Sequence, residues 1–415
     1  MGEEPFPAEI GARVRQIRMQ RGLTLAVVAG LAGIDKTYLS RLERGERFFL
    51  RRGLVEVLAE ALGCAVSDLT GQPYPAVDRA SAEALAALPP ISRVLADATL
   101  DNGVPDVPTR PLGQLARLVA EANGAAADSR YTIAGRDLAQ LLLELHVHAV
   151  TGRDGETRRG ALAALAEGCL VAVGSARSLG NLDLATRVAE RAQEAAARLE
   201  NPALRGFTAM SAAVVLTRVK ADFRAGQVND TALAELERAD PGAADTAPAE
   251  AVGMLHLVRA QRAAKARDAD TAATHLAEAR ALAARTGERR TLRFDFGPAN
   301  VAAWDMAIEV ERGRGTKRAA ALARRRDLFA SLPSADRRSA LFFDIARGFA
   351  QDGGAHDAEA LYHLDLADRA APQRIRNDAI ARELIAELEG RARHRVWELT
   401  SLKARITGPV STANG

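Results

Sequence analysis

The sequence is poor in aromatic residues, which make up 4% of its 415 positions, although hydrophobic residues as a whole make up 48%. β-Sheets favour aromatic and β-branched side chains, so this shortage argues against sandwiches and barrels. A chain of this length allows two or three domains of about 150 residues with a sizeable core. We therefore expect an all-α fold.

Cysteine and long apolar runs are also scarce. Cys64 and Cys169 form neither a CxxC pair nor a disulfide framework, which fits a reducing compartment. The first ten residues are acidic and lack the apolar segment of a signal peptide, and no stretch reaches about 18 uninterrupted apolar residues. The sequence predicts a cytoplasmic protein with no membrane partner.

Signatures of catalysis are missing as well. The sequence has no P-loop, no GxGxxG after a strand, no HExxH and no GxSxG. His146 and His148 stand two positions apart, so they point to different sides of a helix and are not expected to form a metal pair. We expect no enzyme, no catalytic residue, no cofactor and no metal.

The chain as a whole has almost no excess of positive charge, but one segment does have one. The total of 56 basic and 53 acidic residues gives a net charge of +3, too small to coat nucleic acid non-specifically. Between residues 11 and 52, however, ten residues are basic and three are acidic. The positive charge is concentrated in this segment.

The segment contains the strongest motif of the chain, at residues 22–47. Ala29 and Gly33 lie four apart, where a small side chain lets two helices approach and glycine permits a left-handed turn. Asp35 suits the N-cap of a helix over residues 36–44. One side of that helix carries Tyr38, Leu39 and Leu42, and the other carries Lys36, Thr37, Ser40, Arg41 and Arg44. The sequence predicts a helix with one core face and one polar, basic face.

These residues resemble the Cro-like (XRE family) helix-turn-helix, whose second motif helix enters the DNA major groove. The resemblance covers about 60 residues, including a flanking helix over 7–20 and a closing helix over 54–62. It implies that Lys36, Thr37, Ser40 and Arg41 contact base edges and that Arg44 lies near phosphate. The expected DNA-binding set is completed by three further basic residues, Arg47, Arg51 and Arg52.

Two positions depart from the family pattern. Leu25 stands where many members carry a glutamine that contacts the DNA backbone, so this contact should be absent. The loop over residues 45–53 lacks the common proline and carries Phe48-Phe49, which we interpret as packing residues rather than a DNA wedge.

Prolines and glycines predict the domain boundaries. We expect a five-helix DNA-binding domain over residues 1–70 and a proline-containing linker with a first helix over 71–111. A helical domain over 112–405 and a flexible tail over 406–415 would follow. Within the linker region, Pro89-Pro90 is expected to end the first helix.

The second domain resembles tetratricopeptide (TPR) repeats, in which small residues sit where two helices cross. Residues 341–372 fit best, with Ala346-x2-Phe349, Ala360-x3-Leu364, Ala367 and Pro372. Weaker copies place Ala260 with Ala272, Trp304 with Ala320, and Ala176 with Ala185. We expect an α-solenoid of stacked helix pairs.

Such a stack leaves a concave groove lined by the first helix of each pair. Taking Trp304 and Phe342 as equivalent packing positions gives a set of effector-binding candidates: Asn300, Asp305, Glu309, Arg312, Phe343 and Arg347. The alternative for each is an ordinary solvated position. Residues 293–301 also resemble the FGP-x-N stretch of large bacterial XRE-TPR regulators.

The preferred hypothesis is a homodimeric transcription regulator that binds an inverted-repeat operator in double-stranded DNA. Its TPR-like domain would dimerise and sense a peptide, small-molecule or protein effector. The first alternative is a protein-interaction scaffold whose helix-turn-helix is weak or non-functional. The second keeps DNA binding but makes the helical domain an oligomerisation device only.

Overall fold

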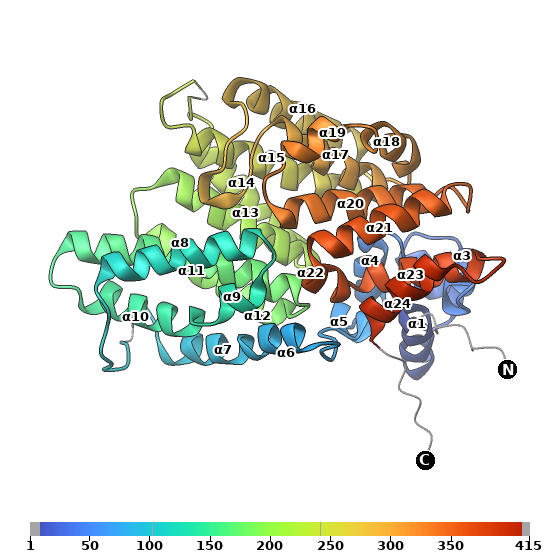
Figure 1. Cartoon of the computed structure of the whole chain (residues 1–415), viewed down its shortest axis with the longest axis horizontal. Helices are drawn as coiled ribbons and strands as arrows, with labels where there is room; N and C mark the ends of the chain where they lie inside the picture. The colour runs from blue at the N-terminus through green and yellow to red at the C-terminus, as the bar shows by residue number, and fades with distance from the viewer. Residues whose placement is uncertain (1–8, 102, 241, 409–415) are drawn as a thin grey trace, which may run out of the picture.

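Five short helices form the N-terminal domain, as expected (Figure 1). The computed structural model of the chain describes residues 9–101, 103–240 and 242–408. The five helices are α1 (Glu9–Gln20), α2 (Leu25–Leu31), α3 (Lys36–Glu43), α4 (Arg52–Leu62) and α5 (Val66–Thr70).

The turn between α2 and α3 has the local structure that the sequence predicts. Gly33 has a φ of +62°, in the left-handed region that glycine adopts without strain. Asp35 caps α3, because its Oδ1 accepts hydrogen bonds from the backbone N–H of Thr37 at 2.7 Å and of Tyr38 at 3.1 Å. α3 therefore begins at a fixed residue and in a fixed direction.

The rest of the chain is also helical, and no strand occurs among the described residues. The first group of helices is α6 (Arg79–Ala86), α7 (Leu88–Asp97), α8 (Leu112–Ala127), α9 (Tyr131–Gly135), α10 (Leu138–Thr151), α11 (Gly155–Ser178), α12 (Leu182–Ala197), α13 (Pro202–Arg218), α14 (Asp222–Leu236), α15 (Ala247–Lys265) and α16 (Ala269–Thr286). A 3-10 turn, η1 (Thr291–Arg293), precedes the second group, α17 (Pro298–Glu311), α18 (Gly315–Leu322), α19 (Arg326–Ala330), α20 (Ala335–Ala350), α21 (Asp357–Ala370), α22 (Pro372–Arg376), α23 (Ala379–Arg391) and α24 (Trp397–Thr407).

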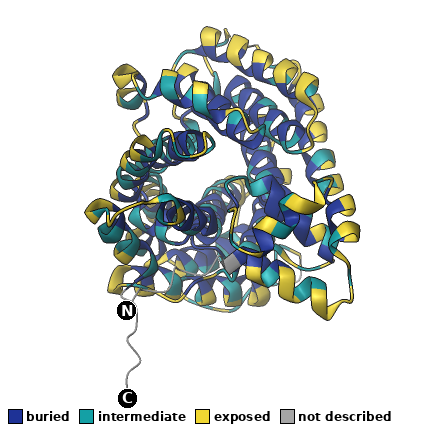
Figure 2. Cartoon of the chain, turned by 90° about the vertical axis from the view of Figure 1, so that its right-hand side faces the viewer, coloured by how far each residue is buried: buried dark blue, intermediate teal, exposed yellow. Residues whose placement is uncertain are grey.

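Helices predicted to pair do pair. α20 and α21 pack along each other, as do α15 with α16, α17 with α18 and α11 with α12. Ala346, Ala360 and Ala367 are fully buried, which is what the repeat pattern requires of small residues at a helix crossing. Figure 2 shows the helices wound around the centre of the molecule, with buried faces turned inward and exposed faces outward.

Two boundary predictions were wrong. Pro89-Pro90 does not end a helix but lies in the first turn of α7, where a missing backbone N–H costs nothing. The region expected as a linker with one helix therefore holds two helices, and Ile91 and Leu95 of α7 are buried in the core. At the other end, α24 continues to Thr407, into the expected tail; residues 409–415 lie outside the described residues.

The hydrophobic core has two parts, and the second joins the two ends of the chain. One part consists of residues from 84 to 308, in α6–α17. The other combines the N-terminal domain with residues of α17–α24, from 299 to 406. The N-terminal domain is thus packed against the C-terminal helices, at the right of Figure 1.

α11 is the one described helix that is long and apolar enough to cross a membrane. Within its most apolar window, 72% of the residues are buried inside the protein. Its apolar side chains are accounted for by the core, which contains Leu165, Cys169 and Val173.

Candidate DNA-binding surface and central cavity

The predicted basic face of α3 is exposed to solvent, and the opposite face of the helix is buried. Lys36, Thr37 and Arg41 are exposed, whereas Leu39 and Leu42 on the opposite face are fully buried. The division between a core face and a polar face is therefore confirmed. Arg47, beyond the end of α3, is exposed as well.

Two members of the expected DNA-binding set, Ser40 and Arg44, contact each other. Arg44 donates from Nη1 to Oγ of the half-buried Ser40, and its Nε forms an ion pair with Glu46 at 2.5 Å. About half of each side chain of that ion pair is exposed. Phosphate can replace Glu46 here at little cost, because such a pair is well solvated.

α3 is held firmly against α1. Arg18 of α1 donates to both carboxylate oxygens of the buried Glu43, at 2.6 and 2.7 Å, and this hydrogen bonding raises the pKa of Arg18. Gly11 lies so close that a Cβ atom there would come within 2.1 Å of the carbonyl oxygen of Leu42. The exposed face of α3 is thus presented on a rigid support.

Buried polar contacts attach the N-terminal domain to the helical domain. Glu311 of α17 accepts hydrogen bonds from the backbone N–H groups of Arg52 and Gly53, both at 3.1 Å. Arg347 of α20 donates to Glu311 at 2.7 Å and to the carbonyl of Leu50 at 2.8 Å. Burial alone raises the pKa of Glu311, but the charges of Arg347 and Lys265 outweigh it and lower that pKa to about 2.

A second set of contacts surrounds the first. Lys265 of α15 binds both carboxylate oxygens of Glu56, at 2.6 and 2.8 Å, and both side chains are largely buried. Glu383 of α23 accepts from the backbone N–H of Ile10 at 3.3 Å and of Phe49 at 3.1 Å. Phe49 is fully buried, in agreement with the packing role expected for it.

These contacts remove Arg52 from the expected DNA-binding surface. Arg52 forms an ion pair with Asp378, and its guanidinium lies 5.8 Å from the ring centre of Phe343, inside the molecule. Arg51 is half-buried beside Gly313, in the turn between α17 and α18. Both were placed in the set because they are basic, but a partner in the helical domain, Asp378, draws Arg52 inward.

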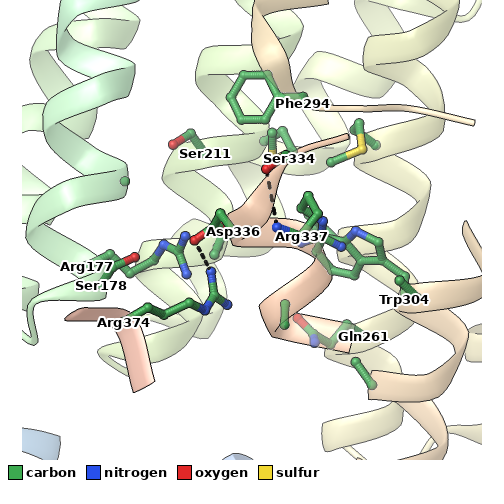
Figure 3. A pocket seen from close by; sticks show the side chains of 18 of the residues that line it. Arg177, Ser178, Ser211, Gln261, Phe294, Trp304, Ser334, Asp336, Arg337 and Arg374 are labelled. Atoms are coloured by element: carbon green, nitrogen blue, oxygen red, sulfur yellow. Dashed lines mark hydrogen bonds and ion pairs between the residues drawn. The ribbon is translucent and has the colours of Figure 1, made fainter. Parts of the chain in front are cut away.

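A cavity of about 220 Å³ lies where the two domains meet, inside the ring of helices. The inner faces of α11, α13, α15, α17 and α20 line it, together with Arg52 of α4 and Arg374 of α22. Nine basic and three acidic side chains face it. Figure 3 shows Arg177 and Arg374 reaching toward Asp336, with Trp304 and Phe294 on other sides of the space.

Asp336 organises one side of the cavity. It forms an ion pair with Arg374 at 2.5 Å and accepts a hydrogen bond from the hydroxyl of Tyr131 at 3.1 Å. Although burial raises the pKa of Asp336, the charges of Arg374 and Arg177 lower it to about 2. Burial raises the pKa of Tyr131 to about 12.

The six effector-binding candidates divide into three groups. Phe343 and Arg347 line the cavity. Asn300 is buried beneath it and accepts a hydrogen bond from the cavity residue Arg337 at 2.6 Å. The remaining candidates do not line it, since they are engaged in ion pairs elsewhere: Asp305 with Arg280 and Arg318, and Glu309 with Arg312.

Sequence reasoning missed the most exceptional cavity residues, Arg177 and Arg218. Each lies in the last turn of its helix, where a basic residue ordinarily needs no explanation because it complements the helix dipole. The available signal was their position on the inner faces of two apolar helices.

Comparison with known proteins matches residues 9–70 to a family described as a helix-turn-helix domain. A search of curated proteins gives no match. Among solved structures, the chain is similar to Bacillus thuringiensis PlcR in complex with the peptide PapR7 and DNA, at 16% identity over 66% of this chain and 94% of that chain, with a TM-score of 0.30. It is also similar to the apo form of ComR from S. thermophilus, at 15% identity over 67% of this chain and 94% of that chain, with a TM-score of 0.21.

The N-terminal residues thus form a helix-turn-helix domain, with α2 and α3 as its two motif helices. The chain carries a helix-turn-helix domain over residues 9–70, and the described residues that follow it form helices that pack in pairs.

Proposed function

We propose that the protein is a homodimeric, cytoplasmic transcription regulator that binds an inverted-repeat operator and whose helical domain senses an effector. The observation that carries this proposal is the exposed basic face of α3 on a helix-turn-helix domain. A dimer would present two α3 helices about one helical turn of DNA apart, so two-fold symmetry calls for an inverted repeat.

Within this proposal Arg41 is the main base-reading residue. Its guanidinium is exposed, and the planar fork of arginine can bridge the two major-groove acceptors of guanine. Lys36, Thr37 and Ser40 line the same face and complete the base-reading set. Arg44, Arg47 and Arg51 approach phosphate, whereas Arg52, which is paired with Asp378, has no part in binding DNA.

The effector, a peptide, small molecule or protein, binds in the helical domain. The central cavity supports this part of the proposal, because Arg52 of the DNA-binding domain lines it together with residues of the helical domain. A ligand can shift DNA affinity only if it interacts differently with two arrangements of the domains. A ligand that touches both domains can do so.

The first test selects genomic fragments with the full-length protein and titrates the best fragment by fluorescence anisotropy across a salt series. We expect a palindromic site bound far more tightly than bulk DNA. R41A should lose about 1–3 kcal/mol of preference for this site. The matched control R15A removes an exposed arginine of α1 and should leave sequence preference unchanged.

Equal, weak and steeply salt-dependent binding of every fragment, with R41A behaving like R15A, would contradict operator recognition. That result would favour the alternative of a protein-interaction scaffold. Sedimentation of the same protein tests the dimer, and a monomer at all concentrations would remove that part of the proposal.

A further inference from the structure

The charges around the central cavity are unbalanced. Each of the three acidic residues that face it already has an arginine partner: Asp336 pairs with Arg374, and both Glu311 and Asp344 pair with Arg347. Two more of the nine basic residues, Arg52 and Lys265, have acidic partners beyond the cavity lining. All three carboxylates of the cavity are therefore paired, whereas some of its basic side chains have no acidic partner.

Among the cavity's basic residues, the side chains of the half-buried Arg177 and Arg218 and of the exposed Arg293 form no hydrogen bond or ion pair with the described residues. Carboxylates act on Arg177 and Arg218 only through charge, from Asp336 on Arg177 and from Asp378 and Glu56 on Arg218. Burial lowers the pKa of both guanidinium groups, and the like charges of Arg52 and Arg177 lower that of Arg218 further. Both side chains are half-buried, and charges withdrawn from bulk water normally have counter-charges nearby, so two such arginines that face one cavity indicate that a bound anion supplies the missing charge.

A second, independent observation comes from Trp304. Its side chain lines the cavity and the residue is 8% exposed, yet its indole N–H has no hydrogen-bond partner among the described residues. Buried indole donors are almost always paired. Besides its cations, the cavity thus has an aromatic surface made by Trp304 and Phe294, with a covered and unpaired indole donor beneath it.

We propose that the cavity binds a small organic anion whose phosphate or carboxylate group is held by Arg177 and Arg218. The apolar part of this ligand lies against Phe294 and Trp304. This proposal identifies the chemistry of the effector, so its consequence for DNA binding rests on the proposed function.

Arg52 connects the anion to the DNA-binding domain. It begins α4 of that domain, and its positive charge acts on Arg218 in the helical domain. Without a ligand, the charges of Arg52, Arg177 and Arg218 repel one another across the junction of the domains. An anion among them cancels this repulsion and stabilises the packed arrangement described above.

The test follows Trp304 fluorescence in full-length protein. Trp397, the other tryptophan, is 73% exposed and is replaced by phenylalanine, which leaves Trp304 as the sole reporter. Four probes are titrated separately: inorganic phosphate, phenyl phosphate, benzoate and the uncharged benzyl alcohol. We expect saturable changes in Trp304 fluorescence with phenyl phosphate and benzoate, weaker binding of inorganic phosphate, and no change with benzyl alcohol. Whichever of phenyl phosphate and benzoate binds more tightly shows whether the site prefers a phosphate or a carboxylate group.

The variant R177M/R218M removes both free charges and keeps side-chain length. We expect it to bind phenyl phosphate at least about tenfold more weakly, since charged hydrogen bonds are lost. In the absence of probe it should unfold at a higher temperature than the parent, because two half-buried charges without ion-pair partners are gone. R159Q, an exposed arginine of the same helix as Arg177, is the matched control and should change neither property.

Unchanged binding of phenyl phosphate by R177M/R218M, or equal binding of benzyl alcohol, would overturn the proposal. So would the absence of any saturable response to both aromatic anions. The readout does not involve DNA: probe binding without an operator refutes the proposed function alone, and an operator without probe binding refutes this inference alone.

Discussion

Replacing Glu311 by glutamine should weaken the attachment of the DNA-binding domain to the helical domain. The carboxylate is buried and accepts from two backbone N–H groups of α4 and from Arg347. Glutamine has nearly the same shape but carries no charge and has a single acceptor oxygen. The substitution therefore weakens the hydrogen bond from one backbone N–H and the hydrogen bond from the buried guanidinium of Arg347, and it leaves no cavity.

The pKa of Glu311 gives the magnitude. The difference between its ordinary value of 4.5 and about 2 corresponds to about 3 kcal/mol that favours the charged carboxylate in the folded protein. A loss of about 3 kcal/mol is a change of roughly 100-fold in the equilibrium for local opening. An effect of this size is within the range measured when one partner of a buried ion pair is removed.

Amide hydrogen exchange of the full-length protein measures this opening directly. In E311Q, peptides covering the start of α4, including Arg52 and Gly53, should exchange roughly 100-fold faster, while peptides of α11 should not change. E309Q is the matched control, because Glu309 lies on the same helix in a half-buried pair with Arg312 and should cost about 0.5 kcal/mol or less. Equal protection of α4 in E311Q and E309Q would refute the reasoning.

Two further predictions concern pH and packing. Since the pKa of Glu311 is lower in the folded protein, the stabilisation that its carboxylate contributes is complete above about pH 4.5 and is lost as the pH falls toward 2. Urea unfolding of wild type and E311Q should therefore show a stability difference that shrinks over that pH interval. A difference that stays constant would contradict this. G11A should destabilise the N-terminal domain by about 1–3 kcal/mol, because the added Cβ would collide with the carbonyl of Leu42. The control G30A, whose added Cβ has no atom within 4 Å, should stabilise α2 by up to about 1 kcal/mol. Equal melting temperatures of G11A and G30A would count against the packing of α1 on α3.

The helix-turn-helix domain could be predicted from the sequence because the information that defines it is local. The cap at Asp35, the turn at Gly33 and the two faces of α3 depend on residues a few positions apart. Helix pairing was also predictable, since small residues at crossing positions repeat along the chain. The same rules misplaced Pro89-Pro90, because proline is accepted in the first turn of a helix as well as after its end.

The tertiary structure alone decided which basic residues are surface groups and which are buried. Arg52 and Arg347 look like their neighbours in sequence, but partners at Asp378 and Glu311 draw them into the junction of the domains. The contact between Ile10 and Glu383 joins positions 373 residues apart, and no periodic pattern encodes such a pairing. The cavity and its unpaired arginines arise at the same junction, because five helices from separate parts of the chain must meet before their inner faces enclose a space.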